Sequence, residues 1–259
     1  EALPTPTLID AQVRELRLIQ THSPRYNRRS KFQERTLWLT LTEEKFPRLT
    51  VRKGHGQLTG DESAIGPFGG TFDADLARQA LHNATPIRQC TPRITTASIK
   101  KASACILFDI KKCSAPCIGE TTEEEYSQVV KKVSSHLSHQ AGDVVAHHFE
   151  RIGALAREER FEEAAEVRNQ LTSFLRGFAR IEALKSFSLI EEMIIAKFAE
   201  ESDEVELAQI RRGRLLTSVT LTSPSQIQPA VERLRSTSHL PLDEELLFPH
   251  STPEEVEML

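Results

Sequence analysis

The sequence predicts an α+β protein assembled from several small segments. Three observations point to this class: strand-like runs near both ends, about sixty central residues with helical periodicity, and four cysteines confined to one loop-rich stretch. The chain has 259 residues, of which 39% are hydrophobic, as in ordinary globular proteins. No apolar run is long enough for a membrane helix, so we expect a cytoplasmic protein without membrane contact.

The first ninety or so residues predict a helix, two strands and a second helix. Apolar residues recur at helical intervals over residues 7–21, and Pro24 ends that helix. Residues 36–42 and 48–52 have strand composition. Six glycines between residues 54 and 70 indicate a loop, and residues 73–83 predict a helix.

The centre of the chain predicts three consecutive helices. Thr121 or Thr122 can cap the first, because three glutamates follow in its first turn. The second begins near Gly142 and the third near Phe161. A connection of only three residues, 158–160, predicts an antiparallel helical hairpin.

The last part of the chain returns to strand patterns. Residues 193–199, 205–210 and 215–222 predict strands, with a hairpin turn at residues 211–214. A helix over residues 225–235 and a short one near Pro253 follow. The net charge of −4 hides an asymmetry: residues 14–53 hold eleven Lys or Arg against four acids, and residues 239–259 hold six acids and no Lys or Arg. The basic stretch is a candidate phosphate-backbone contact, although a solvated surface explains the charge equally well.

The four cysteines predict a single site, because they lie close together in the sequence. Their gaps of fourteen, seven and three residues differ from the paired C-x2-C spacing of structural zinc sites and suit an iron–sulfur cluster. Zinc, or thiols without metal, are the alternatives. Disulfides fit poorly because we find no signal peptide. The candidate ligands are Cys90, Cys105, Cys113 and Cys117.

Four motifs, in order, resemble the UvrC excinuclease family of nucleotide excision repair, and the likeness covers residues 7–185. They are Glu15 with Asn27 in Pro24-Arg25-Tyr26-Asn27; Phe46-Pro47-Arg48-Leu49 with Gly66-Pro67-Phe68; Cys105, Cys113 and Cys117 preceded by Arg88-Gln89-Cys90; and the UVR-like run Phe161-Glu162-Glu163-Ala164-Ala165-Glu166-Val167-Arg168-Asn169-Gln170.

The resemblance implies five segments along the chain. They are the C-terminal remnant of a GIY-YIG nuclease domain at 1–30, a β/α connector at 31–89, the cysteine-cluster region at 90–120, a helical region at 121–185 with the UVR hairpin at about 143–178, and a small α/β tail with an acidic end at 186–259.

For catalysis, the resemblance implies that Glu15 binds Mg²⁺ or Mn²⁺ and that Asn27 supports the same site or the nearby phosphate. The tyrosine motifs of such a site are not in this sequence, which begins with Glu1 rather than Met. We therefore expect part of a longer protein, unable to cleave DNA by itself, and the sequence leaves open whether this chain is an enzyme. The basic residues expected to contact DNA are Arg25, Arg28, Arg29 and Lys31.

For cofactor and partner, the resemblance implies a [4Fe–4S] cluster on the four cysteines, with zinc as the alternative and Cys90 as the least secure ligand. It also implies that the hairpin docks on a UvrB-like helicase. The expected contact residues are Phe161, Ala164, Ala165 and Arg168.

Other functions stay open on the sequence alone. The family's second, RNase H-like nuclease is expected to be absent, because neither strand of the 205–222 hairpin contains Asp. One alternative is a non-catalytic module that binds DNA and a partner. Another is the rear part of a fusion between a DnaQ-like exonuclease and a UvrC-like region. A metal-sensing regulator is the third.

Overall fold

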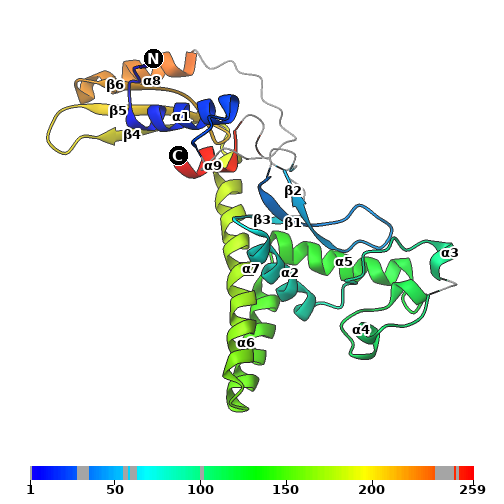
Figure 1. Cartoon of the computed structure of the whole chain (residues 1–259). Coiled ribbons are helices and arrows are strands. Elements are labelled where there is room, and N and C mark those ends of the chain that lie inside the picture. Colours follow the sequence, from blue (N-terminus) through cyan, green and yellow to red (C-terminus); the bar gives the residue numbers. More distant parts are fainter. Residues whose placement is uncertain are drawn as a thin grey trace. The chain divides into compact units, whose positions relative to one another are not determined.

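The computed structural model describes residues 2–27, 35–54, 58, 63–99, 102–236, 248 and 251–259. Helices and two three-stranded antiparallel sheets make up these parts (Figure 1), so the α+β class is confirmed. The chain divides into two compact units. We call them the end unit (Glu1–Arg35, Gly54–Asp61 and Glu182–Leu259) and the middle unit (Thr36–Lys53 and Glu62–Ile181).

The end unit is built around one antiparallel sheet of strand order β4-β5-β6. The hairpin turn between the last two strands was predicted correctly, and both residues at its centre, Arg212 and Gly213, have positive φ. The elements of this unit are α1 (Leu8–His22), β4 (Met193–Phe198), β5 (Val205–Arg211), β6 (Arg214–Leu221), α8 (Ile227–Ser236) and α9 (Pro253–Met258).

Helices pack against both faces of β5, whose buried apolar residues alternate between the two faces. Val205 and Leu207 pack with Ala230 of α8, and Ile210 packs with Val13 of α1. The N-terminal helix therefore completes a core that the C-terminal part of the chain begins. Arg17 of α1 strengthens this contact with an ion pair of 2.6 Å to Glu255 of α9.

The middle unit contains the second sheet, of order β2-β1-β3. The sequence predicted the four longer helices of this unit, and it did not predict the two four-residue helices of the cysteine region. Its elements are β1 (Leu37–Leu41), β2 (Leu49–Lys53), β3 (Ala64–Phe68), α2 (Thr71–Ala84), α3 (Thr96–Ile99), α4 (Ile106–Asp109), a 3₁₀ turn η2 (Pro116–Ile118), α5 (Glu123–Ser138), α6 (Gly142–Arg157) and α7 (Phe161–Ser188), of which the part up to Ile181 belongs here.

Strand β3 corrects the expectation of a loop between residues 54 and 70. Gly66 lies inside the strand with φ of +134°, and a Cβ at this position would meet the Leu37 carbonyl oxygen at 2.9 Å. The glycine therefore permits the close approach of β3 to β1. The wrong prediction came from treating every glycine as a sign of a loop.

The three central helices begin where the sequence predicted, and the connection between the second and the third lies at the predicted residues. Thr122 caps α5 in a capping box, in which its hydroxyl accepts from the Glu125 N–H and the Glu125 carboxylate accepts from the Thr122 N–H. Residues 158–160 reverse the chain between α6 and α7, and Glu159 adopts a positive φ of 58° there. Among the described residues, no helix combines the length and apolar character needed to cross a membrane.

Candidate functional site

A surface pocket of about 490 Å³ in the end unit brings Glu15 and Asn27 together. Glu15 projects from α1 on the same side as His22, because seven residues make two helical turns. After α1 ends, Ser23 adopts a left-handed conformation with φ of 43°, and the chain turns back so that Asn27 lines the same pocket. The sequence prediction had joined these two residues only through a family resemblance.

The chemistry of this pocket suits a hard cation beside a phosphate. Glu15 offers carboxylate oxygens and Asn27 an amide oxygen, which are the ligands that Mg²⁺ and Mn²⁺ prefer. Arg14 and His22 also line the pocket and can donate hydrogen bonds to an anionic substrate, and Arg14 adds positive charge. One carboxylate cannot complete a metal site alone, so water and substrate oxygens would have to supply the other ligands.

An exposed aromatic residue lies beside the pocket. Tyr26 is 87% exposed, and the Arg25 guanidinium lies 5.9 Å from the centre of its ring. An exposed ring with a neighbouring cation can stack on a base while the cation meets a phosphate. Arg25 is thus placed as a DNA contact would need to be. The other expected DNA contacts, Arg28, Arg29 and Lys31, lie outside the described residues.

The cysteines lie in loops of the middle unit between α2 and α5. Cys105 immediately precedes α4, and Cys117 lies within η2. Cys113 is buried, whereas Cys90 and Cys105 are exposed. Burial is the main reason that the pKa of the Cys113 thiol is raised, and the three other thiols raise it further. All four sulfurs are therefore electrostatic neighbours.

A buried arginine fastens the first cysteine to the rest of the middle unit. Arg88 is 0% exposed; its Nε donates to the Phe46 carbonyl oxygen at 2.6 Å, and its guanidinium pairs with Glu44 at 2.7 Å. The same guanidinium donates to the carbonyl oxygen of Cys90 at 2.8 Å and approaches its Sγ at 3.4 Å. Its backbone N–H donates to the hydroxyl of Tyr126. We call this network the Arg88 clamp.

Sequence reasoning missed the role of Arg88, although it noted the residue beside Cys90. The available signal was an arginine next to a candidate ligand, since a guanidinium offsets the charge of thiolates. The arginine acts in this way on Cys117, whose pKa is raised mainly by burial and then by Cys90 and Cys105, while Arg88 opposes the rise.

The donor set fits a thiolate-bound metal centre in its chemistry. Four soft sulfur ligands and an adjacent buried cation are typical of iron–sulfur or zinc sites. Within the described ranges, however, no three His, Cys, Asp or Glu side chains are arranged so that they could hold a metal ion. The other cysteines thus raise the pKa of Cys113 and Cys117, but the described residues form no closed ligand set.

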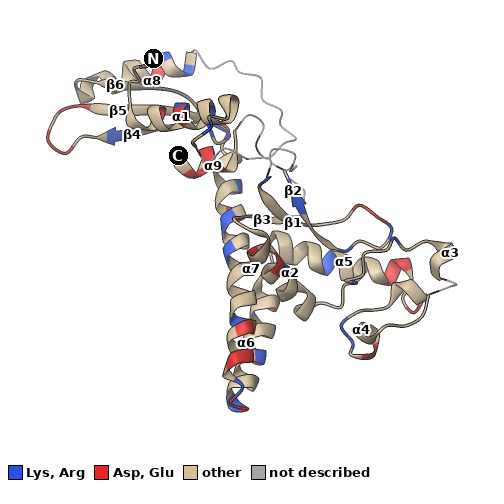
Figure 2. Cartoon of the chain, viewed as in Figure 1, with Lys and Arg blue, Asp and Glu red and all other residues tan. Residues whose placement is uncertain are grey.

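The hairpin of α6 and α7 presents an exposed apolar residue at its turn. Phe161, the first residue of α7, is 66% exposed, and Phe149 of α6 is 64% exposed. Ala164 is nearly buried, Ala165 is partly buried and Arg168 is exposed. Acidic and basic residues both occur along the hairpin toward its turn (Figure 2).

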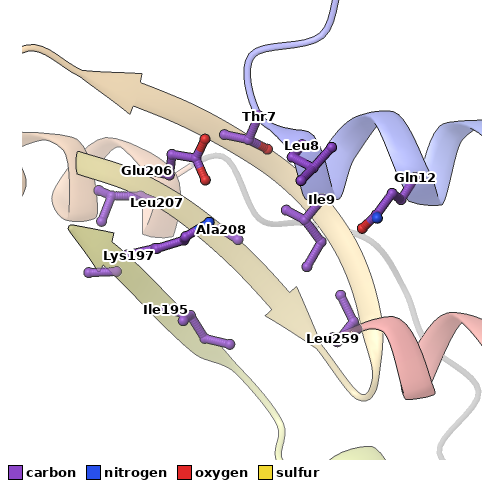
Figure 3. Close-up of a pocket in the computed structure, with 11 residues that line it drawn as sticks. Thr7, Leu8, Ile9, Gln12, Ile195, Lys197, Glu206, Leu207, Ala208 and Leu259 are labelled. Carbon is purple, nitrogen blue, oxygen red and sulfur yellow. The ribbon is translucent and has the colours of Figure 1, made fainter. Parts of the chain in front are cut away.

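A further pocket of about 470 Å³ in the end unit contains none of the predicted site residues. Leu8 and Ile9 of α1 face Ile195 of β4 across it (Figure 3). Lys197 and Glu206, which are cross-strand partners, form part of its polar rim. The lining of this pocket is mostly apolar.

Comparison with known proteins gives one family match. Residues 36–136, most of the middle unit, match the family model described as the UvrC/Cho excinuclease middle domain. No solved structure matches the chain significantly.

Several curated proteins are similar over most of the chain. The chain is 30% identical to a Mycobacterium tuberculosis protein named as a bifunctional exonuclease/endonuclease, over 88% of the chain and 34% of that protein. It is 29% identical to UvrABC system protein C of Chlorobium phaeobacteroides, over 85% of the chain and 35% of the relative. It is 31% identical to UvrABC system protein C of Methanosarcina acetivorans, over 65% of the chain and 31% of the relative. The chain spans about a third of the length of these relatives.

Proposed function

Because the chain belongs to the UvrC family, we propose that it contributes to the incision of damaged DNA in nucleotide excision repair. In this proposal it forms part of a metal-dependent endonuclease of the GIY-YIG type. The observation that carries it is the shared pocket of Glu15 and Asn27. These two residues match separate positions of one family motif, and they line one surface.

In the proposed site, each residue has a role set by its chemistry. Hydrolysis of a phosphodiester builds negative charge on the phosphate oxygens, and a bound Mg²⁺ or Mn²⁺ would offset that charge. Glu15 would hold the ion through its carboxylate, and Asn27 would orient the ion or the phosphate through its amide. Arg25 would bind the DNA backbone at the edge of the pocket.

Metal binding by the pocket can be tested on this chain alone. Addition of Mn²⁺ should broaden the side-chain amide resonances of Asn27 in the NMR spectrum, and Glu15→Gln should abolish the broadening. Asp10→Asn, on the same helix, is the matched control and should leave it unchanged. Broadening that persists in Glu15→Gln would remove Glu15 from the site. In a protein with the complete nuclease domain, Glu15→Gln should lower the incision rate by about 10²–10³-fold.

We further propose that Cys90, Cys105, Cys113 and Cys117 hold a [4Fe–4S] cluster. Two observations support this proposal. The neighbouring cysteines raise the pKa of the Cys113 and Cys117 thiols, and the Arg88 guanidinium lies beside the sulfur of Cys90. The cluster would fasten loops that have little apolar core of their own. When bound, it would supply a rigid covalent link and no step of the incision.

The cluster has a spectroscopic signature. Anaerobically purified protein should absorb at about 400 nm, and Cys113→Ser should lose this band whereas Ser114→Ala keeps it. A colourless protein that contains zinc in a one-to-one ratio would show instead that the site is a zinc site.

The hairpin is the proposed docking surface for a UvrB-like helicase. Phe161 supports this, because its large apolar side chain is exposed at the turn. A partner that covers it would remove this apolar surface from water. Phe161→Ala should weaken binding to such a helicase at least about tenfold in a calorimetric titration. The control is Phe72→Ala, which removes another exposed phenylalanine, on α2. Equal affinities of the wild type and Phe161→Ala would contradict the proposal.

A second candidate is the rear part of an exonuclease–endonuclease fusion. The observation that favours it is the likeness to the Mycobacterium tuberculosis protein, of which the chain covers 34%. In that case the coding sequence before Glu1 would encode a DnaQ-like exonuclease as well as the start of the GIY-YIG domain. Sequencing of the gene decides between the fusion and a UvrC protein without an exonuclease. A non-catalytic module would lack both.

A further inference from the structure

The middle unit contains a pocket of about 340 Å³ that is separate from the cysteines' sulfurs and from the hairpin turn. Four segments meet there: the end of α2, the loop after α4, the middle of α6 and one turn of α7. None of the described residues that line it is acidic. The lining residues are Asn83, Lys112, His147, His148, Arg151 and Val167.

A chain of neutral amides holds Lys112 at the edge of this pocket. Its Nζ donates to Asn83 Oδ1 at 2.9 Å, and the Asn83 Nδ2 donates to Gln170 Oε1 at 2.8 Å. Gln170 in turn donates to Gln79 at 3.1 Å. These hydrogen bonds fix the position of the ammonium group and leave its positive charge uncompensated.

Arg151 shares with Lys112 the lack of an acidic partner among the described residues. In the part of the chain that the structure describes, no carboxylate forms an ion pair with either side chain. Arg151 helps to lower the pKa of Glu163, but Arg160 is the main cause and already binds that carboxylate at 2.6 Å. The positive field reaches His82, whose pKa falls to about 4 through burial first and then through Arg78 and Lys112.

His148 adds an unsatisfied polar atom to the wall of the pocket. Its side chain is 0% exposed, and its Nδ1 lies 2.8 Å from the Val144 carbonyl oxygen. A carbonyl can only accept, so Nδ1 carries the proton. The other ring nitrogen, Nε2, is buried and has no hydrogen-bond partner among the described residues. An anion beside Nε2 would let the ring take a second proton and donate to that anion.

The geometry points to a phosphate-binding site in this pocket. Lys112 and Arg151 would bind the phosphate oxygens by charge, and His147 and His148 would donate hydrogen bonds from α6. Lys112 is held by amides and Arg151 is exposed, and neither has an acidic partner among the described residues. Together with the buried Nε2 of His148, which lacks a hydrogen-bond partner there, they favour an anion with several oxygens. The site would bind the oxygens of a DNA backbone phosphate or of free inorganic phosphate in the same way. We assign it to DNA, an assignment that rests on the proposed function, whereas the site itself does not.

The main experiment measures binding of a fluorescent DNA duplex between 50 and 200 mM salt. The double variant Lys112→Gln/Arg151→Gln should bind at least about tenfold more weakly at low salt, and the slope of log affinity against log salt should fall by about one to two. Arg157→Gln removes an exposed cation from another face of α6 and should change the slope less. Unchanged affinity and slope in the double variant would overturn the assignment to DNA.

A second arm uses inorganic phosphate and does not depend on DNA. Saturable shifts of the His147 and His148 ring resonances are expected in the NMR spectrum of the wild type, and they should be lost in Arg151→Gln alone. This single variant leaves the neighbourhood of Cys113 unchanged. Shifts without any effect on DNA binding would identify free phosphate as the ligand. Absence of shifts together with an unchanged DNA slope would overturn the site.

A failure of the proposed function is distinguishable from a failure of this site. Should the wild type bind no DNA even at 50 mM salt, DNA binding by this chain is wrong, and the phosphate arm alone decides the pocket. DNA binding that Arg25→Gln weakens and the double variant leaves intact would keep the proposed function and remove this pocket from it.

Discussion

The cysteine segment, residues 86–119, and the hairpin of α6 and α7 belong to the same unit but are held in place by different interactions. In the cysteine segment, one buried cation, Arg88, joins residues 90–92 to residues 44–46 through hydrogen bonds and an ion pair. In the hairpin, apolar side chains such as Leu155 and Phe174 are buried, and the ion pairs of Arg160 are on the surface. A clamp concentrates stability in one side chain, whereas an apolar stripe distributes it.

The largest effect is expected from loss of the clamp. Arg88→Ala would leave buried carbonyl oxygens and the Glu44 carboxylate without their partner, so the free energy of unfolding should fall by about 3–5 kcal/mol. Trp38, the single tryptophan of the chain, is buried in the middle unit and reports urea unfolding by its fluorescence. Arg93→Ala, an exposed arginine in the same segment, is the control and should change stability by less than about 0.5 kcal/mol.

Replacement of Arg88 by lysine sharpens this prediction. A lysine keeps the charge but cannot donate in several directions from one plane, so Arg88→Lys should restore only a small part of the lost stability. Full recovery in Arg88→Lys would mean that charge alone holds the segment, and that the hydrogen bonds to Phe46, Cys90 and Pro92 contribute little.

A smaller effect is expected from a truncation in the hairpin. Leu155 is 1% exposed, and Leu155→Ala should lower the free energy of unfolding by about 3 kcal/mol, because the neighbouring side chains relax only partly into the cavity. Leu155→Met should lose less than about 1.5 kcal/mol, since it nearly conserves volume. Equal losses in both variants would show that the stripe is not packed as described.

Acid should weaken the region between the two, where His82 on α2 lies near Lys112 of the cysteine segment. The folded-state pKa of His82 is about 4 against 6.5 when unfolded, so its contribution is fully present above pH 6.5 and is lost as the pH falls toward 4. With allowance for its partial exposure, the loss is about 2 kcal/mol. His82→Gln should remove this part of the pH dependence in urea titrations at pH 7, 5.5 and 4.5. If the free energy of unfolding depends on pH identically in the variant and the wild type, a group other than His82 causes the acid sensitivity.

The hairpin could be predicted from the sequence because its signals are local. A capping residue, a stripe of apolar positions and a three-residue connection all lie within neighbouring turns of the chain. The same is true of the β5–β6 hairpin. Strand β3 was missed because glycines such as Gly66 are typical of loops. Only the close approach of the partner strand β1 explains why a glycine is needed there.

The parts of the candidate sites that could not be predicted depend on distant contacts. Thr7 donates a hydrogen bond to Ser218 at 2.8 Å across 211 positions, and no local pattern indicates that α1 packs on the C-terminal sheet. The pocket lined by Lys112 and Arg151 likewise brings together side chains from four separate segments. Glu15 and Asn27 were found in advance only because a family motif joins them, and the structure adds that one turn after α1 places them on one pocket.

The smallest effect on stability is expected at the turn of the hairpin, from Phe161→Ala. Phe161 is 66% exposed, so little apolar surface is lost from the folded core, and the free energy of unfolding should change by less than about 0.5 kcal/mol. The fluorescence of Trp38 in urea measures this directly. A loss above about 2 kcal/mol would show that Phe161 stabilises the hairpin itself. Its exposure would then no longer support a docking role, because weaker partner binding could follow from a disordered turn.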